Sequence, residues 1–111
     1  MSGVNELSRV SIAKNVAWAF SNLCRGKPAP DFGVVRASLP VLSRLVNHAD
    51  LEVVRDACWA LSYLSEREDD RIVVVIDSGS VPRLVDLAES TNASVLTPAL
   101  RCVGKLARLF L

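Results

Sequence analysis

The stretches NVAWAFSNLCRG, residues 15–26, and DACWALSYLSE, residues 56–66, decide the fold of this chain. Each predicts a helix, because its apolar residues recur at intervals of three and four. Trp18 and Trp59 occupy matched positions in the two stretches, 41 residues apart. A third segment, RCVGKL at residues 101–106, aligns with WAFSNL and WALSYL. The chain therefore repeats a helical unit.

A second pair of matching segments sets the length of the repeat. SLPVLSRLV at residues 38–46 aligns with SVPRLVDLA at residues 80–88, so that Pro40 and Pro82 are 42 residues apart. A period of about 40 to 47 residues is typical of armadillo and HEAT helical repeats. We therefore predict an all-α, right-handed armadillo-type solenoid with one partial and two complete three-helix repeats.

Glycine, proline and capping residues mark the expected helix ends. The first helix ends at Gly26, Pro40 lies in the first turn of a later helix, and Asp50 is a plausible N-cap. The segment IVVVI, residues 72–76, has the β-branched composition of a strand, but the flanking period favours a helix. The helices expected after Gly26 cover about residues 31–37, 38–47, 51–65, 69–78, 80–89 and 93–108.

This parse divides the chain into four parts, which are the third helix of a partial repeat (1–26), two armadillo repeats (27–66 and 67–108) and a tail (109–111). Such repeats bury their apolar faces by stacking, and no segment resembles a polar cap. We therefore expect apolar surface at both ends, self-association through those ends, and a chain that is a central piece of a longer solenoid.

The two tryptophans lie on the polar side of their helices when each residue is turned by about 100°. Their companions at the offsets −3 and +4 are Asn15 and Asn22 around Trp18, and Asp56 and Tyr63 around Trp59. The opposite side of each helix is apolar, with Ala13, Val16, Phe20 and Leu23 in the first and Val54, Ala57, Leu61 and Leu64 in the second. Either the tryptophans pack against neighbouring repeats or they form a binding surface.

The polar companions favour a binding surface for an extended, basic peptide. Packed helices lie roughly 8–10 Å apart, and a peptide advances about 3.3–3.6 Å per residue, so about three peptide residues span two helices. An indole attracts a lysine side chain, and the Asn22 amide has both a donor and an acceptor for a peptide backbone. Asp56 supplies the opposite charge.

The segments NVAWAFSNLCRGKPAPD, DACWALSYLSE and IDSGSVPRLVDL, together with VLTPALRCVGKLA, resemble the central repeats of importin-α, the armadillo adaptor that binds nuclear localisation signals. The resemblance implies a cargo groove in which Trp18 and Asn22 form one pair, with Asn15 beside them. It implies that Trp59 and Tyr63 continue the groove and that Arg101 stands at the next tryptophan position. The family has asparagine where this chain has Lys105.

The resemblance also implies work in cytoplasm and nucleus, with importin-β bound only if a further N-terminal segment exists. The alternative is an armadillo-repeat fragment that interacts structurally and does not bind cargo effectively. Lys105 and the limited number of repeats favour that alternative, whereas the preserved tryptophans favour the adaptor.

Composition and charge argue against other classes. With 13 basic and 12 acidic residues the formal net charge is +1, which gives no electrostatic case for nucleic acid or a membrane surface. The three cysteines show no paired spacing and are expected to be free thiols. His48 is the only histidine, and the acidic cluster from Glu66 to Asp70 lacks a calcium-loop pattern. We expect neither an enzyme nor a cofactor or metal.

Overall fold

The computed structural model describes residues 3–66 and 68–109, and this part of the chain contains helices and no strands. The helices are α1 (Gly3–Arg25), α2 (Phe32–Val46), α3 (Leu51–Leu64), α4 (Asp69–Asp77), α5 (Val81–Leu87) and α6 (Ala93–Ala107). The predicted all-α fold is confirmed, and the IVVVI segment lies inside α4 as expected. Residue 67 and residues 110–111 of the predicted tail lie outside the described residues.

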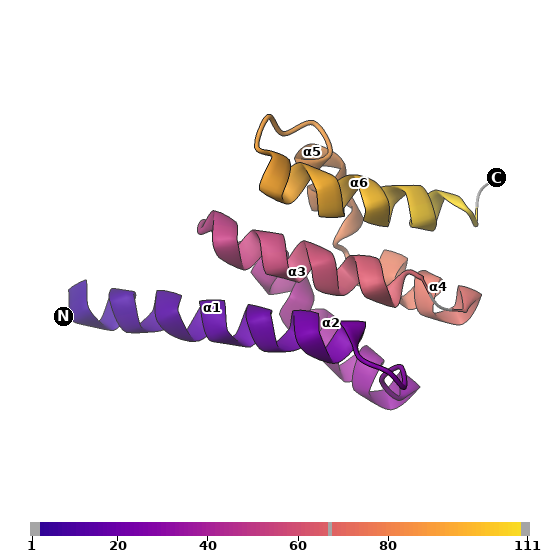
Figure 1. The fold of residues 1–111 in the computed structure, drawn as a ribbon, viewed down its shortest axis with the longest axis horizontal. Helices are drawn as coiled ribbons and strands as arrows, with labels where there is room; N and C mark the ends of the chain where they lie inside the picture. Colours follow the sequence, from indigo (N-terminus) through magenta and orange to yellow (C-terminus); the bar gives the residue numbers. More distant parts are fainter. Residues whose placement is uncertain (1–2, 67, 110–111) are drawn as a thin grey trace.

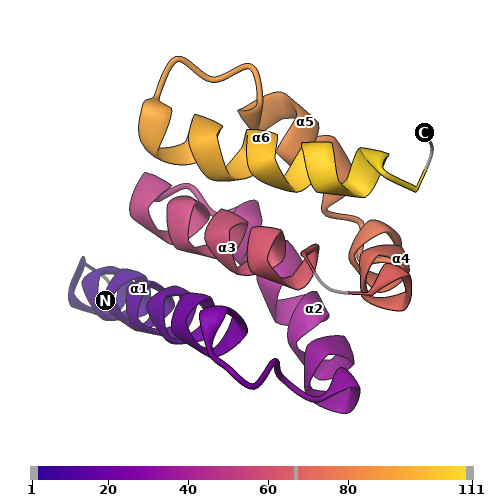
Figure 2. The same cartoon turned by 45° about the vertical axis from the view of Figure 1, so that its right-hand side comes forward.

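The helices form two layers. Helices α1, α3 and α6 run side by side in the front layer of Figure 1, whereas α2, α4 and α5 lie behind them. Figure 2 shows the same stacking after the molecule is turned, with α3 between α1 and α6. The front layer brings the three aligned segments of the repeat together, because each of them lies on one of its helices.

Helix α3 is the centre of the core. Its fully buried apolar residues are Val53, Val54, Ala57, Cys58, Ala60, Leu61 and Leu64. The flanking helices bury Ala17 and Cys24 from α1 and Ala99 and Cys102 from α6. A helix covered on several sides is apolar around most of its circumference. The apolar side that the sequence predicts for α3 is therefore confirmed, and the buried surface is wider than predicted.

The two ends of the stack present apolar side chains, as predicted. At one end, a depression on α1 is lined by Val16, Ala19, Phe20 and Leu23. At the other end, a second depression is lined by Ile76, Val81, Val103, Leu106 and Ala107. The prediction that Leu23 faces the core is wrong, because Leu23 is 46% exposed. Helix α1 packs on α3 with Ala17 and Cys24 buried, and the other residues predicted for the apolar side, Ala13, Val16 and Phe20, are partly buried against the core.

Helix α2 corrects the prediction of separate helices at residues 31–37 and 38–47. It is one helix, with Pro40 in its interior and not in a first turn. Proline in a helix interior costs about 3 kcal/mol because it removes a hydrogen bond and crowds the preceding turn. The buried residues follow one continuous face with helical spacing, namely Val35, Ser38, Leu39, Leu42, Leu45 and Val46. Burial of that face outweighs the cost, so the first complete repeat holds two helices and not three.

Asp50 begins α3 as the sequence predicts. Its Oδ1 accepts hydrogen bonds from the backbone N–H groups of Glu52 at 2.9 Å and Val53 at 3.2 Å. An N-cap aspartate satisfies donors that the first helical turn leaves without partners. Gly79 follows α4 with a φ of 85°, a left-handed conformation that glycine adopts without strain. These residues set the start of α3 and the turn between α4 and α5.

Candidate peptide-binding surface

Three side-chain pairs lie on the helices of the front layer, each pair four residues apart on its helix. They are Trp18 and Asn22 on α1, Trp59 and Tyr63 on α3, and Arg101 and Lys105 on α6. Residues four apart share one helix face. The three pairs, together with Asn15, Asp56 and Glu66, are called the ladder surface below.

Contacts between helices show that the three pairs share a surface. Lys14, one turn before Trp18, lies with its Nζ 3.6 Å from Oε1 of Glu52, which is on the Trp59 side of α3. The Cζ atom of Arg101 on α6 lies 5.7 Å from the centre of the Trp59 ring. The ladder surface therefore runs from α1 across α3 to α6.

The first pair is open at its tryptophan and closed at its asparagine. Trp18 is 63% exposed. The Asn22 Nδ2 group donates to the Trp18 carbonyl at 3.1 Å, and its Oδ1 accepts from Nη2 of Arg25 at 2.6 Å. A peptide can reach the indole directly, whereas it must displace contacts within α1 to pair with this amide. Asn15, one turn earlier, is exposed.

The second pair is covered by its neighbours. Trp59 is half-buried, and its ring stacks on Tyr63 with centroids 5.8 Å apart and planes inclined by 26°. Arg101 lies over the same indole, within the roughly 6 Å at which a cation is attracted to an aromatic face. The two tryptophans that the sequence treats as equivalent therefore stand in different environments.

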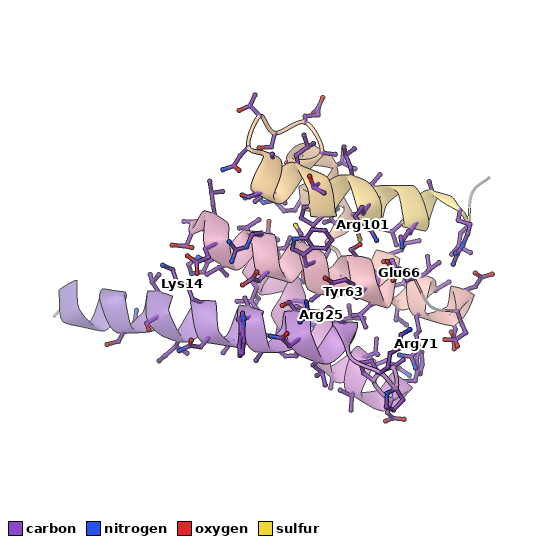
Figure 3. All side chains as sticks on the ribbon, in the orientation of Figure 1. Lys14, Arg25, Tyr63, Glu66, Arg71 and Arg101 are labelled. Carbon is purple, nitrogen blue, oxygen red and sulfur yellow. The ribbon has the colours of Figure 1, made fainter. Side chains whose placement is uncertain are left out.

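Glu66 anchors both cations of the third pair. Its Oε1 accepts from Nη2 of Arg101 at 2.9 Å and from Nζ of Lys105 at 2.5 Å. Figure 3 shows Arg101 and Glu66 close together beside Tyr63, where α6 lies next to the end of α3. The hydrogen bond from Lys105 is the main cause that lowers the pKa of Glu66; desolvation opposes it, and the Lys105 and Arg101 charges and the Arg101 hydrogen bond add to the lowering.

Asp56 is turned towards its own neighbour. It is only 8% exposed, and its Oδ1 accepts from Nε of Arg55 at 3.0 Å. This hydrogen bond is the main cause that raises the pKa of Arg55. Attraction between Asp56 and a peptide lysine stays a prediction, and the structure places the carboxylate where Arg55 already balances it.

Sequence reasoning gave Glu66 no role on the ladder surface, although it stands seven residues after Trp59 on the same helix side. Its partners are 35 and 39 residues away in the chain, so local spacing carries no sign of them.

The described residues contain no group of three or more histidine, cysteine, aspartate or glutamate side chains that could hold a metal ion. Within residues 3–66 and 68–109, no helix combines the length and apolarity needed to cross a membrane.

The two-layer stack and its repeated front helices define an armadillo solenoid. The Armadillo/beta-catenin-like repeat model matches residues 33–66 and 68–108, and the chain belongs to this family. A designed armadillo repeat protein, solved in complex with peptide (KR)4, shares the fold with a TM-score of 0.75 at 22% identity over 87% of this chain and 41% of that one. An engineered protein gives a TM-score of 0.73 at 29% identity over 85% of this chain and 38% of its own.

The chain is also similar to curated importin alpha subunits. The chain is 50% identical to importin subunit alpha-3 of Arabidopsis thaliana over 106 residues, which are 96% of this chain and 20% of that protein. It is 52% identical to importin subunit alpha-1b of Oryza sativa subsp. japonica over 103 residues, or 93% of this chain and 19% of that protein. The resemblance to importin-α is thus confirmed, and the chain spans about a fifth of the length of these relatives.

Proposed function

We propose that this chain is the central part of a nuclear import adaptor and that it holds a lysine- and arginine-rich signal peptide of cargo proteins on the ladder surface. The observation that carries the proposal is Trp18, a large aromatic side chain that stands 63% exposed beside Asn22. A ring that is mostly exposed contributes little to the stability of the free protein, whereas its burial under a partner supplies contact area.

The chemistry of the first pair suits a basic peptide. A lysine places its apolar stem along an indole and its ammonium over the ring. Asn22 donates to a carbonyl and accepts from Arg25 within its own helix, so it holds the donor and acceptor that a peptide backbone requires. Exchange of those contacts for peptide contacts conserves the number of hydrogen bonds.

The partners and location follow from the same proposal. The similarity to importin alpha subunits supports work between cytoplasm and nucleus, with importin-β bound only through a further N-terminal segment. We include no enzymatic activity, cofactor, nucleic acid or membrane partner in the proposal. The division into parts at residues 1–26, 27–66, 67–108 and 109–111 belongs to it as well, as does self-association through the two apolar ends.

A second candidate is an armadillo-repeat interaction fragment without effective cargo binding. The internal contacts of Asn22 and Asp56 favour it, because both side chains are engaged before a peptide arrives. The exposed Trp18 favours the adaptor, since a structural role does not require an open indole.

Fluorescence anisotropy with a labelled (KR)4 peptide tests the proposal on the 111-residue chain. Trp18→Ala should weaken binding by about 1–2 kcal/mol, the range of a cation–π contact that becomes partly desolvated. Val73→Ala is the matched control, because Val73 is an exposed residue on α4 in the other layer. An acidic peptide, (DE)4, should not bind. Equal affinities of the Trp18 and Val73 variants, or no binding by the unchanged chain, would favour the interaction fragment.

A further inference from the structure

We propose that Arg101 is an internal competitor for the Trp59 indole, which leaves Trp18 as the open position and makes Trp59 a closed one for basic peptides. This inference rests on the proposed peptide-binding function and adds a specificity-determining residue to it. A basic side chain of the peptide gains contact at Trp18 without displacing anything from the ring, whereas at Trp59 it must first displace Arg101.

The contact between Arg101 and Trp59 reproduces the interaction that a peptide would make. The guanidinium lies 5.7 Å from the ring centre, in the range of a cation–π contact. Trp59 also stacks on Tyr63, so two groups of this chain contact the indole. Among the described residues, no cation lies over Trp18 in the same way.

Glu66 holds the competitor in place. Nη2 of Arg101 donates to its Oε1 at 2.9 Å, and this tie crosses from α6 to the end of α3. A tethered cation competes more strongly than a free one, because its position is already restricted before it contacts the ring. Displacement of Arg101 by a peptide therefore breaks both the ring contact and the hydrogen bond to Glu66.

Replacement of Lys105 is the control that distinguishes the loss of a positive charge from the uncovering of the Trp59 ring. It is bound to the same Oε1 atom of Glu66 at 2.5 Å and carries the same charge as Arg101, but among the described residues it makes no cation–π contact with the Trp59 ring. Loss of either cation removes one positive charge from the ladder surface and one donor from Glu66. Only loss of Arg101 uncovers the indole.

The experiment measures (KR)4 binding to Arg101→Ala and Lys105→Ala in chains that keep or lack Trp59. Arg101→Ala should bind about two- to fivefold more tightly than Lys105→Ala, the factor expected for uncovering an exposed cation–π site. With Trp59→Ala added to both, that difference should vanish. Both variants should also bind (KR)4 more tightly than the unchanged chain, because each has lost a positive charge that repels the peptide. This shared gain in affinity should shrink at high salt, which screens repulsion between exposed charges.

A second readout follows the indole itself. In a Trp18→Phe background, Trp59 is the only tryptophan, and its emission should respond to (KR)4 when Arg101 is replaced by alanine or glutamine and not when Arg101 is present. Arg101 is an exposed side chain, so its replacement should preserve the helical circular dichroism.

The outcomes separate this inference from the proposed function. Equal binding of the Arg101 and Lys105 variants, or a difference that survives loss of Trp59, overturns the competitor role while Trp18-dependent binding still supports the peptide site. Absence of Trp18-dependent binding in every variant overturns both.

Discussion

The two tryptophans should contribute very differently to the free energy of unfolding, although they hold matched positions in the repeat. Trp18 is 63% exposed and stands on α1. Trp59 is half-buried between α3 and α6, stacked on Tyr63 and covered by Arg101. The perturbation is a single replacement, Trp18→Ala or Trp59→Ala, in otherwise identical chains.

The expected losses in the free energy of unfolding follow from how much of each tryptophan side chain is buried. Replacement of a core tryptophan by alanine costs about 3–5 kcal/mol. About a third of Trp18 is covered, so its loss costs roughly 1–1.5 kcal/mol, of which the better helix propensity of alanine returns about 0.5. Trp59 loses a larger covered area, a ring pair worth about 0.5–1.5 kcal/mol and a cation–π contact worth about 0.5–1. We expect a cost of about 3–4 kcal/mol for Trp59 and under about 1 for Trp18.

Urea unfolding followed by far-ultraviolet circular dichroism measures both values, because that signal does not depend on the tryptophan that has been removed. The denaturant slope should stay the same, so the midpoints report stability directly. Val73→Ala, an exposed substitution on α4, gives the background of an ordinary surface change. If the two tryptophan variants lose the same free energy, the contacts of Trp59 with Tyr63 and Arg101 are not stabilising and the reasoning fails.

Further predictions concern buried groups, pH and the ends of the stack. Ser62 is fully buried and its Oγ has no hydrogen-bond partner among the described residues, so Ser62→Ala should stabilise the chain by about 1 kcal/mol in urea unfolding; a loss would contradict this. Burial raises the pKa of Cys58 to about 12 and that of Cys102 to about 11, so both should resist a disulfide reagent at about pH 8 until denaturant is added. The lowered pKa of Glu66 stabilises the fold above its unfolded pKa of about 4.3, and this contribution should be lost as the pH falls through the lower folded value. Stability at about pH 7 and pH 3, compared with Glu66→Gln, checks this, and an unchanged difference would refute it. Sedimentation at micromolar concentration should show self-association that Leu23→Glu on the apolar depression of α1 reduces, and a monomer at all concentrations would argue against the end contacts.

The repeat made the architecture predictable from the sequence, and local signals were unreliable where packing decides. The β-branched run IVVVI lies in a helix, as the repeat period indicates and its strand-like composition does not. Pro40 indicates a helix start, yet α2 continues through it because a buried face runs along the whole helix. Leu23 shares the apolar side of its helix and is nevertheless exposed, since burial depends on a neighbour that the helix itself does not encode.

The helix side on which the candidate site residues lie could be predicted from the sequence, whereas the contacts that cover their rings could not. Helical spacing places Trp18 and Trp59 on one surface, because residue spacing alone determines the side of a helix on which a residue lies. Whether an indole is open depends on the residue that the next helix presents. Beside Trp18, the next helix carries Trp59, a rigid ring that stacks on Tyr63 of its own helix. Beside Trp59, α6 carries Arg101, a long side chain that reaches back over the ring and is anchored by Glu66. The arginine at this position of α6 therefore covers the Trp59 ring, whereas among the described residues no cation lies over Trp18 in a cation–π contact.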